Sequence, residues 1–237
     1  MLTRPTRLPA GSRLSSPSII PGACPRSCAA VGAGLSLNLG AMTTPTYRIR
    51  LAVPDDMPAI LGLIGSSAAW LQENKHTDQW ARPWPDRDER DTRVAQGIRD
   101  GLTWMVEGRE GVLIGTVTCR EHGNDMLWTP TELAEPAAYV SRLIVSRDRA
   151  GQGIGAALIH WVGARAVDQW GASWVRVDVW TSNLGLHDYY KGQGFEHLRT
   201  LDFQHYWEYP SAALFHKPTA EIDKESVARF ELTEEVS

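Results

Sequence analysis

The stretch LIVSRDRAGQGIGAAL at residues 143–158 decides the fold. Apolar residues 143–145 end a predicted strand, and three glycines then lead into an apolar helix, expected over 153–170. A glycine-rich turn between a strand and a helix directs several backbone N–H groups and the positive end of the helix dipole at one point. The stretch therefore predicts a cradle for a phosphate group, because glycine lets an anion approach the backbone closely.

The segments on either side predict a mixed sheet covered by helices. Alternating and β-branched residues favour strands, and apolar residues at helical spacing favour helices. The expected strands are 47–53, 103–106, 112–118, 139–145, 173–180, 195–201 and 211–216, and the expected helices are 56–72, 86–100, 153–170 and 183–191. The last two strands are expected to pair with each other. The fold class is therefore α+β, with a central mixed, mostly antiparallel sheet flanked by helices.

Composition divides the 237 residues into three parts. Residues 1–42 hold four Arg and no Asp or Glu among many Pro, Ser, Gly and Ala, which predicts a disordered extension. A wrongly assigned start before Met42, a natural flexible tail and an organelle transit peptide all fit this extension. Residues 43–217 predict a single domain. Residues 218–237 hold six acids and two bases, which predicts a solvated acidic tail.

Charge and composition also exclude several classes of protein. Lys and Arg number 24 against 28 Asp and Glu, so nucleic acid is not an expected partner. No apolar run approaches the roughly 18 residues of a membrane-spanning helix, so no membrane is expected as a partner either. Three cysteines do not make a disulfide framework, which points to the cytoplasm. Neither the cysteines nor the histidines have metal-ligand spacing, and no metal is expected.

The glycine turn alone is compatible with a second kind of ligand. Gly151, Gly153 and Ala156 also fit a dinucleotide fingerprint, and Asp178 lies at a strand end further along the chain. That fingerprint normally begins its fold and is followed by several βα units. Here about a hundred core residues precede it, so the architecture disfavours a dinucleotide.

A second motif follows the next strand, with Asn183, Leu186, Tyr190 and the pair Gly194-Phe195. Over residues 140–195, the two motifs resemble the GNAT superfamily of N-acetyltransferases in order and spacing. The family pattern is V-x-P-x-x-(Q/R)-x-x-G-x-(G/A), then N-x-x-A-x-x-x-Y-x-x-x-G-F. The resemblance implies a single-domain GNAT-like fold with a β-α-β-α core that binds acyl-CoA. It also implies transfer of acetyl from acetyl-CoA to a primary amine, by direct attack through a tetrahedral intermediate.

The resemblance places coenzyme A along the glycine turn and the strand before it. The amides of 152–156 would bind the pyrophosphate, and the backbone of 143–145 would pair with the pantetheine arm and stabilise the oxyanion. The cofactor-binding residues expected from this are Leu143, Ile144, Val145, Arg149, Gly151, Gln152, Gly153, Ile154, Gly155, Ala156 and Asn183. Ala150 stands where the family has Gln or Arg, so a phosphate contact would have to come from Arg147 or Arg149.

Two residues are expected to be catalytic. Tyr190 falls on the family's tyrosine and would protonate the departing thiolate, because a phenol stays protonated at neutral pH. The alternative is a tyrosine of the core. Asn183, seven residues earlier, shares the same helix face, so both are expected to face the cofactor. Asp178 is the expected general base, with Glu73, Glu135 or a water relay as alternatives.

The acceptor pocket is expected between the first two helices, their loop and the segment before the glycine-motif strand. Aromatic walls with a carboxylate suit a small organic amine, through cation–π contact and charge pairing. The expected substrate-binding residues are Trp70, Glu73, Trp84, Tyr139 and Arg142. A core position is the alternative for each tryptophan, and an inter-strand salt bridge is the alternative for Arg142.

Two questions stay open at this stage. Ala150, and the lack of a carboxylate at 140–142, leave a non-catalytic acyl-CoA-binding sensor of the same fold as the alternative function. Many relatives in the superfamily dimerise, so a homodimer is a further possible partner besides the small-molecule amine acceptor.

Overall fold

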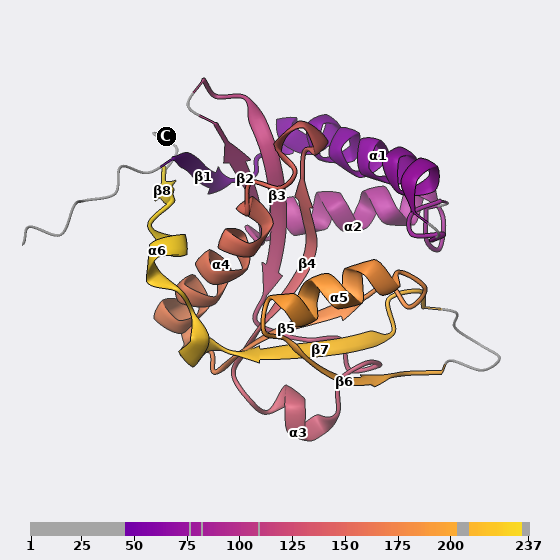
Figure 1. Ribbon diagram of the computed structural model, residues 1–237, viewed down its shortest axis with the longest axis vertical. Helices are drawn as coiled ribbons and strands as arrows, with labels where there is room; N and C mark the ends of the chain where they lie inside the picture. The colour runs from indigo at the N-terminus through magenta and orange to yellow at the C-terminus, as the bar shows by residue number, and fades with distance from the viewer. Residues whose placement is uncertain (1–45, 76, 82, 109, 203–208, 234–237) are drawn as a thin grey trace, which may run out of the picture. The chain divides into compact units, whose positions relative to one another are not determined.

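A computed structural model describes residues 46–75, 77–81, 83–108, 110–202 and 209–233 (Figure 1). The extension expected at 1–42 lies outside these residues. The strands are β1 Tyr47–Leu51, β2 Thr103–Glu107, β3 Leu113–Arg120, β4 Ala137–Val145, β5 Trp174–Val179, β6 Glu196–Thr200, β7 Ala213–Pro218 and β8 Phe230–Leu232. The helices are α1 Met57–Asn74, α2 Arg87–Arg99, α3 Pro130–Leu133, α4 Ile154–Trp170, α5 Leu184–Gly192 and α6 Lys224–Val227, with 3-10 turns at Pro54–Asp56, Arg147–Arg149 and Thr219–Glu221.

In the described residues, all eight strands form one sheet in the order β6-β7-β5-β4-β3-β2-β1-β8. The pairs β4–β5 and β1–β8 are parallel, and the other pairs are antiparallel. The expected mixed, mostly antiparallel sheet is therefore confirmed, as is the pairing of the last two expected strands, β6 and β7.

The two faces of the sheet carry different helices (Figure 1). On one face α4 buries Leu158 and Val162 against sheet residues that include Val117. On the other face α1 and α2 pack around Ile144 of β4, and Ile98 of α2 is buried there. Alternate residues of a strand point to opposite faces, so each central strand serves both helical layers.

The prediction of a solvated acidic tail after residue 217 is wrong for the described residues 218–233. Residues 219–227 form a 3-10 turn and α6, which packs on α4. Phe230 is buried in β8, pairs with Tyr47 of β1 and lies 5.7 Å from its ring. The apolar residues Ile222, Val227 and Phe230 are spaced among the acids, so charge counting missed a segment that is anchored by its few apolar side chains.

Candidate functional site

Strands β4 and β5 lie side by side over only part of their length. Their parallel pairing joins Ala137–Val140 to Trp174–Val177 and then stops. Beyond that point, β4 continues along β3 to Val145, whereas β5 continues along β7 to Val179. The edges of β4 and β5 that follow the last pair are therefore not bonded to each other.

The free edge of β4 carries the backbone groups of Leu143 and Val145. On the opposite edge, the Ser146 amide donates to the Ile114 carbonyl at 2.8 Å, and Ile144 is paired with β3. Successive residues of a strand direct their N–H and C=O groups to opposite edges. The groups of Leu143 and Val145 thus point toward the β5 side, where an extended ligand can bond to them as an added strand does.

A β-bulge interrupts β4 where this free edge begins. Ser141 lies opposite Thr118 and Ile144 lies opposite Thr116, so β4 has one residue more than β3 between the two pairs. Arg142 takes the left-handed conformation in the bulge, with a φ of 49°. Few residues other than glycine adopt this conformation, and residues that do so gather at functional sites.

The glycine turn presents a row of amide groups without acceptors. Gly151 and Gly153 have φ values of 80° and 69°, and Gly153 precedes α4 with no side-chain cap and no acid in the first helical turn. The first bond within the helix is donated by the Ala157 amide, and no acceptor for the amides of 151–156 lies among the described residues. These amides and the helix dipole form an anion cradle beside the end of β4.

The C-terminal segment holds the outer side of this turn. Arg229 donates to the carbonyl oxygens of Gln152 at 3.0 Å and Gly153 at 3.3 Å, and its guanidinium lies 5.3 Å from the centre of the Tyr47 ring. Carbonyl groups that accept from Arg229 point away from the amide side of the turn. The segment around β8 therefore fixes the orientation of the cradle.

Tyr190 lies in α5 with its ring in the core. The ring is 7% exposed and packs edge-on against Phe195, with the ring centres 5.2 Å apart. Its hydroxyl makes no hydrogen bond within the described ranges. Burial raises the pKa of Tyr190, and the nearby charges of Tyr189 and Asp178 raise it further. Tyr190 is therefore a protonated phenol at neutral pH.

Asp178 lies on β5, one residue beyond the last β4–β5 pair. It is half-buried, and its Oδ2 accepts from the Tyr209 hydroxyl at 2.8 Å. Burial raises the pKa of Asp178, while the bond from Tyr209 and the charges of Arg120 and Arg142 oppose the rise. A carboxylate with a raised pKa next to a protonated phenol is a suitable pair for general base and general acid catalysis.

The loop between α1 and α2 lies over the junction of β5 and α5. The Trp180 indole N–H donates to Asp78 at 2.9 Å, and the Asn183 side chain donates to Gln79. Thr77 and Ser182 add a contact at 3.4 Å between their hydroxyls. These bonds hold the loop as a wall on the β5 side of the opening, which is the region where β4 and β5 continue beyond their last pair.

The sequence pattern of the acetyltransferase (GNAT) family matches residues 69–195, which include the glycine turn, both strands and α5. The chain belongs to this family. An uncharacterised N-acetyltransferase of Bacillus subtilis strain 168, YesJ, is 26% identical over 151 residues, which are 62% of this chain and 80% of YesJ. The GNAT domain thus makes this protein an acyltransferase of the N-acetyltransferase kind.

Solved GNAT structures have the same fold. An acetyltransferase from Listeria monocytogenes 4b F2365 has a TM-score of 0.57 and 23% identity, with 73% of this chain and 94% of that one covered. A spermidine N-acetyltransferase from Vibrio cholerae, solved with CoA and spermine, has a TM-score of 0.50 and 16% identity, covering 75% and 98%.

The GNAT fold brings several of the expected site residues together. Tyr190 and Asp178 interact electrostatically, and Asp178 does so with Arg142 as well. Trp84 joins this group, because its ring lies edge-on to Tyr209 with 5.0 Å between ring centres. The free edge at 143–145 connects the group to the glycine turn.

Asn183, expected to face the cofactor, uses its side chain within the protein. Its Oδ1 accepts from the Leu186 amide at 3.0 Å, and its Nδ2 donates to Gln79. Both ends of the buried amide are therefore occupied. The family motif places asparagine here as the N-cap of α5, a role for which this residue type is strongly preferred.

Tyr139 and the alternative base Glu135 lie in a different cluster. The Tyr139 hydroxyl accepts from Arg176 at 3.0 Å, and its ring lies edge-on to Trp128 at 5.5 Å. Arg176 also pairs with Glu135. Tyr139 belongs to the part of β4 that is paired with β5, which precedes the free edge.

Trp70, Glu73 and Arg149 lie at the margins of the site. The Arg147 guanidinium stacks on the Trp70 ring at 3.5 Å, so Trp70 supports the glycine turn. Glu73 is exposed near the end of α1. Arg149 is exposed, and its Nε lies 3.5 Å from the Asp148 carboxylate.

Sequence reasoning missed Tyr209, Arg93 and Arg120. Tyr209 lies outside both family motifs, and Arg93 is one of several charged residues of α2. Arg120 follows the apolar run of β3, where strand alternation places it on the α2 face. That alternation was a usable signal for Arg120, whereas the position of Tyr209 depends on tertiary structure alone.

Strain at the glycine turn gives a direct test of the cradle. Alanine at Gly153 has to adopt the left-handed conformation, at a cost of roughly 1–2 kcal/mol, or else turn the amides away. We expect Gly153→Ala to raise the Kd for acetyl-CoA about tenfold, as measured by calorimetric titration.

The matched control for Gly153→Ala lies at the other end of the same helix. Gly171 has the same φ of 69° and nothing within 4 Å of an added Cβ. Gly171→Ala should cost similar thermal stability and leave the Kd unchanged. Equal effects of both substitutions on the Kd would contradict a cradle at Gly153.

None of the helices in the described ranges is both long and apolar enough to cross a lipid bilayer. Over those same residues, no three His, Cys, Asp or Glu side chains are grouped as metal ligands.

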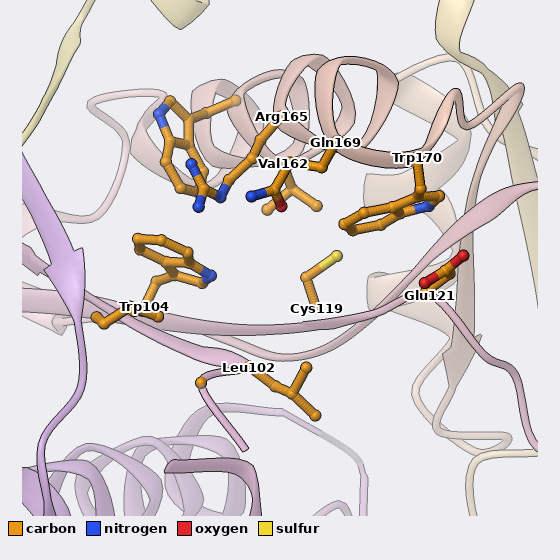
Figure 2. Close-up of a pocket in the computed structure, with 11 residues that line it drawn as sticks. Leu102, Trp104, Cys119, Glu121, Val162, Arg165, Gln169 and Trp170 are labelled. Atoms are coloured by element: carbon orange, nitrogen blue, oxygen red, sulfur yellow. The ribbon is translucent and has the colours of Figure 1, made fainter. Parts of the chain in front are cut away.

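A pocket of about 200 Å³ lies on the α4 side of the sheet (Figure 2). Figure 2 shows Arg165, Gln169 and Trp170 of α4 facing Trp104 and Cys119 of the sheet. The Arg165 guanidinium lies 4.3 Å from the Trp104 ring centre. No residue expected at the acyl-transfer site lines this pocket, so it is distinct from the opening between β4 and β5.

Cys119 in this pocket should be unreactive. Burial raises the pKa of its thiol to about 12, so the thiolate is scarce at neutral pH. We expect iodoacetamide to modify Cys119 at least about a hundredfold more slowly than a free cysteine at pH 7.5, and faster as the pH rises. The measurement uses a variant with serine at Cys24 and Cys28, and the same variant in denaturant is the control. Rapid modification of the folded protein would show that the thiol is accessible.

Proposed function

We propose that this enzyme transfers acetyl from acetyl-CoA to the primary amine of a small molecule. The observation that carries the proposal is the free edge of β4 at Leu143 and Val145, which runs from the glycine cradle to Asp178 and Tyr190. One continuous path thus offers donors for an anion, a strand edge for an extended arm and an acid–base pair at its end.

The cofactor fits this path in two parts. The amides of 152–156 suit the pyrophosphate of acetyl-CoA, because they are unpaired and lie at the helix N-terminus. The backbone of Leu143 and Val145 suits the amide groups of the pantetheine arm. The Vibrio cholerae relative solved with CoA supports this assignment.

The chemistry needs two protons removed from the acceptor nitrogen, one before the attack and one after it, and one proton supplied to the thiolate. Asp178 accepts a proton from the acceptor ammonium, and the neutral amine attacks the thioester carbonyl to form a C–N bond. A backbone N–H of β4 at 143–145 stabilises the oxyanion of the tetrahedral intermediate. As the C–S bond breaks, the Tyr190 hydroxyl gives its proton to the leaving thiolate, and the second proton of the acceptor nitrogen then restores the phenol.

The opening is covered by a loop and by aromatic side chains, and this cover supports a small acceptor. The α1–α2 loop is bonded to Trp180 and Asn183, and Trp84 packs on Tyr209 beside Asp178. An aromatic wall held in place in this way encloses a compact amine better than a protein surface.

The decisive experiment is calorimetric titration of the protein with acetyl-CoA, followed by assays of thiol release with a panel of primary amines. Binding together with amine-dependent thiol release supports the proposal. Binding without release on any amine would favour the acyl-CoA sensor, and no binding at millimolar acetyl-CoA would overturn the cradle.

A further inference from the structure

Three arginines lie around Asp178 and its partner Tyr209: Arg142 acts electrostatically on both, Arg120 on Asp178 and Arg93 on Tyr209. Arg142 comes from the bulge of β4, Arg120 from the end of β3, and Arg93 from α2. Arg120 and Arg93 both interact electrostatically with Arg142, and Arg120 also interacts with Asp178. Three elements distant in sequence thus place positive charge on the side of the opening that faces α2.

Arg142 has no ion pair or hydrogen bond with the described residues. It is half-buried, and Asp178 is the carboxylate that acts on it electrostatically. Burial and the repulsion of Arg120 and Arg93 lower the pKa of Arg142 to about 10, which still leaves the guanidinium charged at neutral pH. Asp178 offsets part of this repulsion and also accepts a bond from Tyr209.

The two neighbouring arginines are only partly satisfied. Arg93 donates to the Trp84 carbonyl, its Nε is buried without a hydrogen-bond partner, and Glu89 lies at 3.9 Å. Arg120 makes one long contact, 3.4 Å to the Ser141 hydroxyl. Like charges gathered in a partly buried site with so few acceptors repel one another, and an anionic ligand between them reduces this repulsion.

We propose that the acceptor carries a carboxylate as well as its amine, and that Arg142, assisted by Arg93 and Arg120, binds this carboxylate. The inference rests on the proposed acetyl transfer. Arginine suits the task, because its planar fork makes two parallel hydrogen bonds to a carboxylate. Since Asp178 acts on Arg142 electrostatically without an ion pair between them, the amine and the carboxylate belong to one short molecule of the amino acid type.

The same charges act against polyamines. The Vibrio cholerae relative was solved with spermine, a molecule with several positive charges and no acid group. In the present site, such a chain would meet the guanidinium groups of Arg142 and Arg120. Repulsion of this kind discriminates between substrates as effectively as attraction does.

The test compares amino acids with their carboxamides, which retain the amine and the shape and lose the negative charge. Glycine, β-alanine, 4-aminobutyrate and a set of L-amino acids are assayed for thiol release beside their amides and spermidine. We expect the best acid to exceed its amide in kcat/KM by about 10- to 100-fold, the range of a charge-assisted hydrogen bond. In Arg142→Gln, the ratio of kcat/KM for the acid to kcat/KM for its amide should fall below about threefold. In Arg120→Gln, this ratio should decrease.

The matched control variant is Arg99→Gln. Arg99 is an exposed residue of α2 that bonds Gln96, so this substitution removes one charge from the helix of Arg93 outside the site. The acid-to-amide ratio should stay unchanged. Since Arg142 occupies a strained backbone position, Arg120→Gln on the regular strand β3 decides the outcome if Arg142→Gln fails to fold.

The outcomes separate this inference from the proposed function. Thiol release on amides or spermidine at rates equal to those of the acids would overturn the inference and leave the acetyl transfer intact. No binding of acetyl-CoA would overturn the acetyl transfer. If no amine is acetylated, the acids and the amides are titrated into the CoA-saturated protein instead. Acids that bind no more tightly than their amides, or that do not bind, overturn the inference.

Discussion

Replacing Tyr190 with phenylalanine will lower kcat at least about a hundredfold, the usual contribution of a general acid. The ring packs in the core against Phe195 and Phe215, and phenylalanine fills the same space. The substitution therefore removes the proton donor and little else. Steady-state thiol release gives kcat, and calorimetric titration should find the Kd for acetyl-CoA within about twofold of its original value.

Tyr189 provides the matched control for Tyr190→Phe. It is the preceding residue, its ring lies edge-on to Tyr190 at 5.4 Å, and its hydroxyl approaches Gly155 at the start of α4. Tyr189→Phe should change kcat by less than about fivefold, since its hydroxyl lies beside Gly155 of the cradle. A kcat in Tyr190→Phe equal to that of Tyr189→Phe would exclude Tyr190 as the acid.

Replacing Asp178 with asparagine will lower kcat/KM by about a hundredfold or more at neutral pH. Asparagine retains the shape and can still accept from the Tyr209 hydroxyl, yet it takes no proton from an ammonium group. The measurement is thiol release with the best acceptor. Asp188→Asn is the control, since Asp188 is an exposed residue of α5 that pairs with Lys191 at 3.7 Å. Activity retained in Asp178→Asn would assign the base to another group or to water.

The pH profile of the enzyme gives a second test of Asp178. Its raised pKa means that the carboxylate forms only above the usual aspartate range, so kcat/KM should rise with pH through that higher pKa. Tyr209→Phe removes a bond that stabilises the charged form, so the acidic limb should move to higher pH. A limb that stays in place after Tyr209→Phe would show that Asp178 does not control it.

Much of the fold was predictable, because the two motifs fix local structure. The glycine stretch needs a strand before it and a helix after it, and helix α4 begins one residue from the expected position. The joining of Tyr190 with Asp178 also follows from the strand and helix that carry them. In contrast, the capping role of Asn183 was not predicted, because helix spacing shows which residues share a face and not which hydrogen bonds a helix end needs.

The remaining parts of the site depend on contacts between distant segments. The bulge at Arg142 exists because β3 and β4 differ by one residue in register, and no local signal in the sequence encodes that difference. Tyr209 reaches Asp178 only through the placement of the segment before β7. The approach of Arg93 to Arg142 depends on how α2 lies on the sheet.

Strand β8 sets the order in which this protein can become functional during synthesis. β1 is made early, yet its partner β8 and the brace Arg229 are made after every other element of the sheet. A growing chain that ends at Pro218 has the glycine turn without the guanidinium that holds Gln152 and Gly153. Its β1 edge is also open to pairing with other chains, a hazard of any uncovered strand. Translation of the last strand therefore both closes the sheet and completes the cofactor turn.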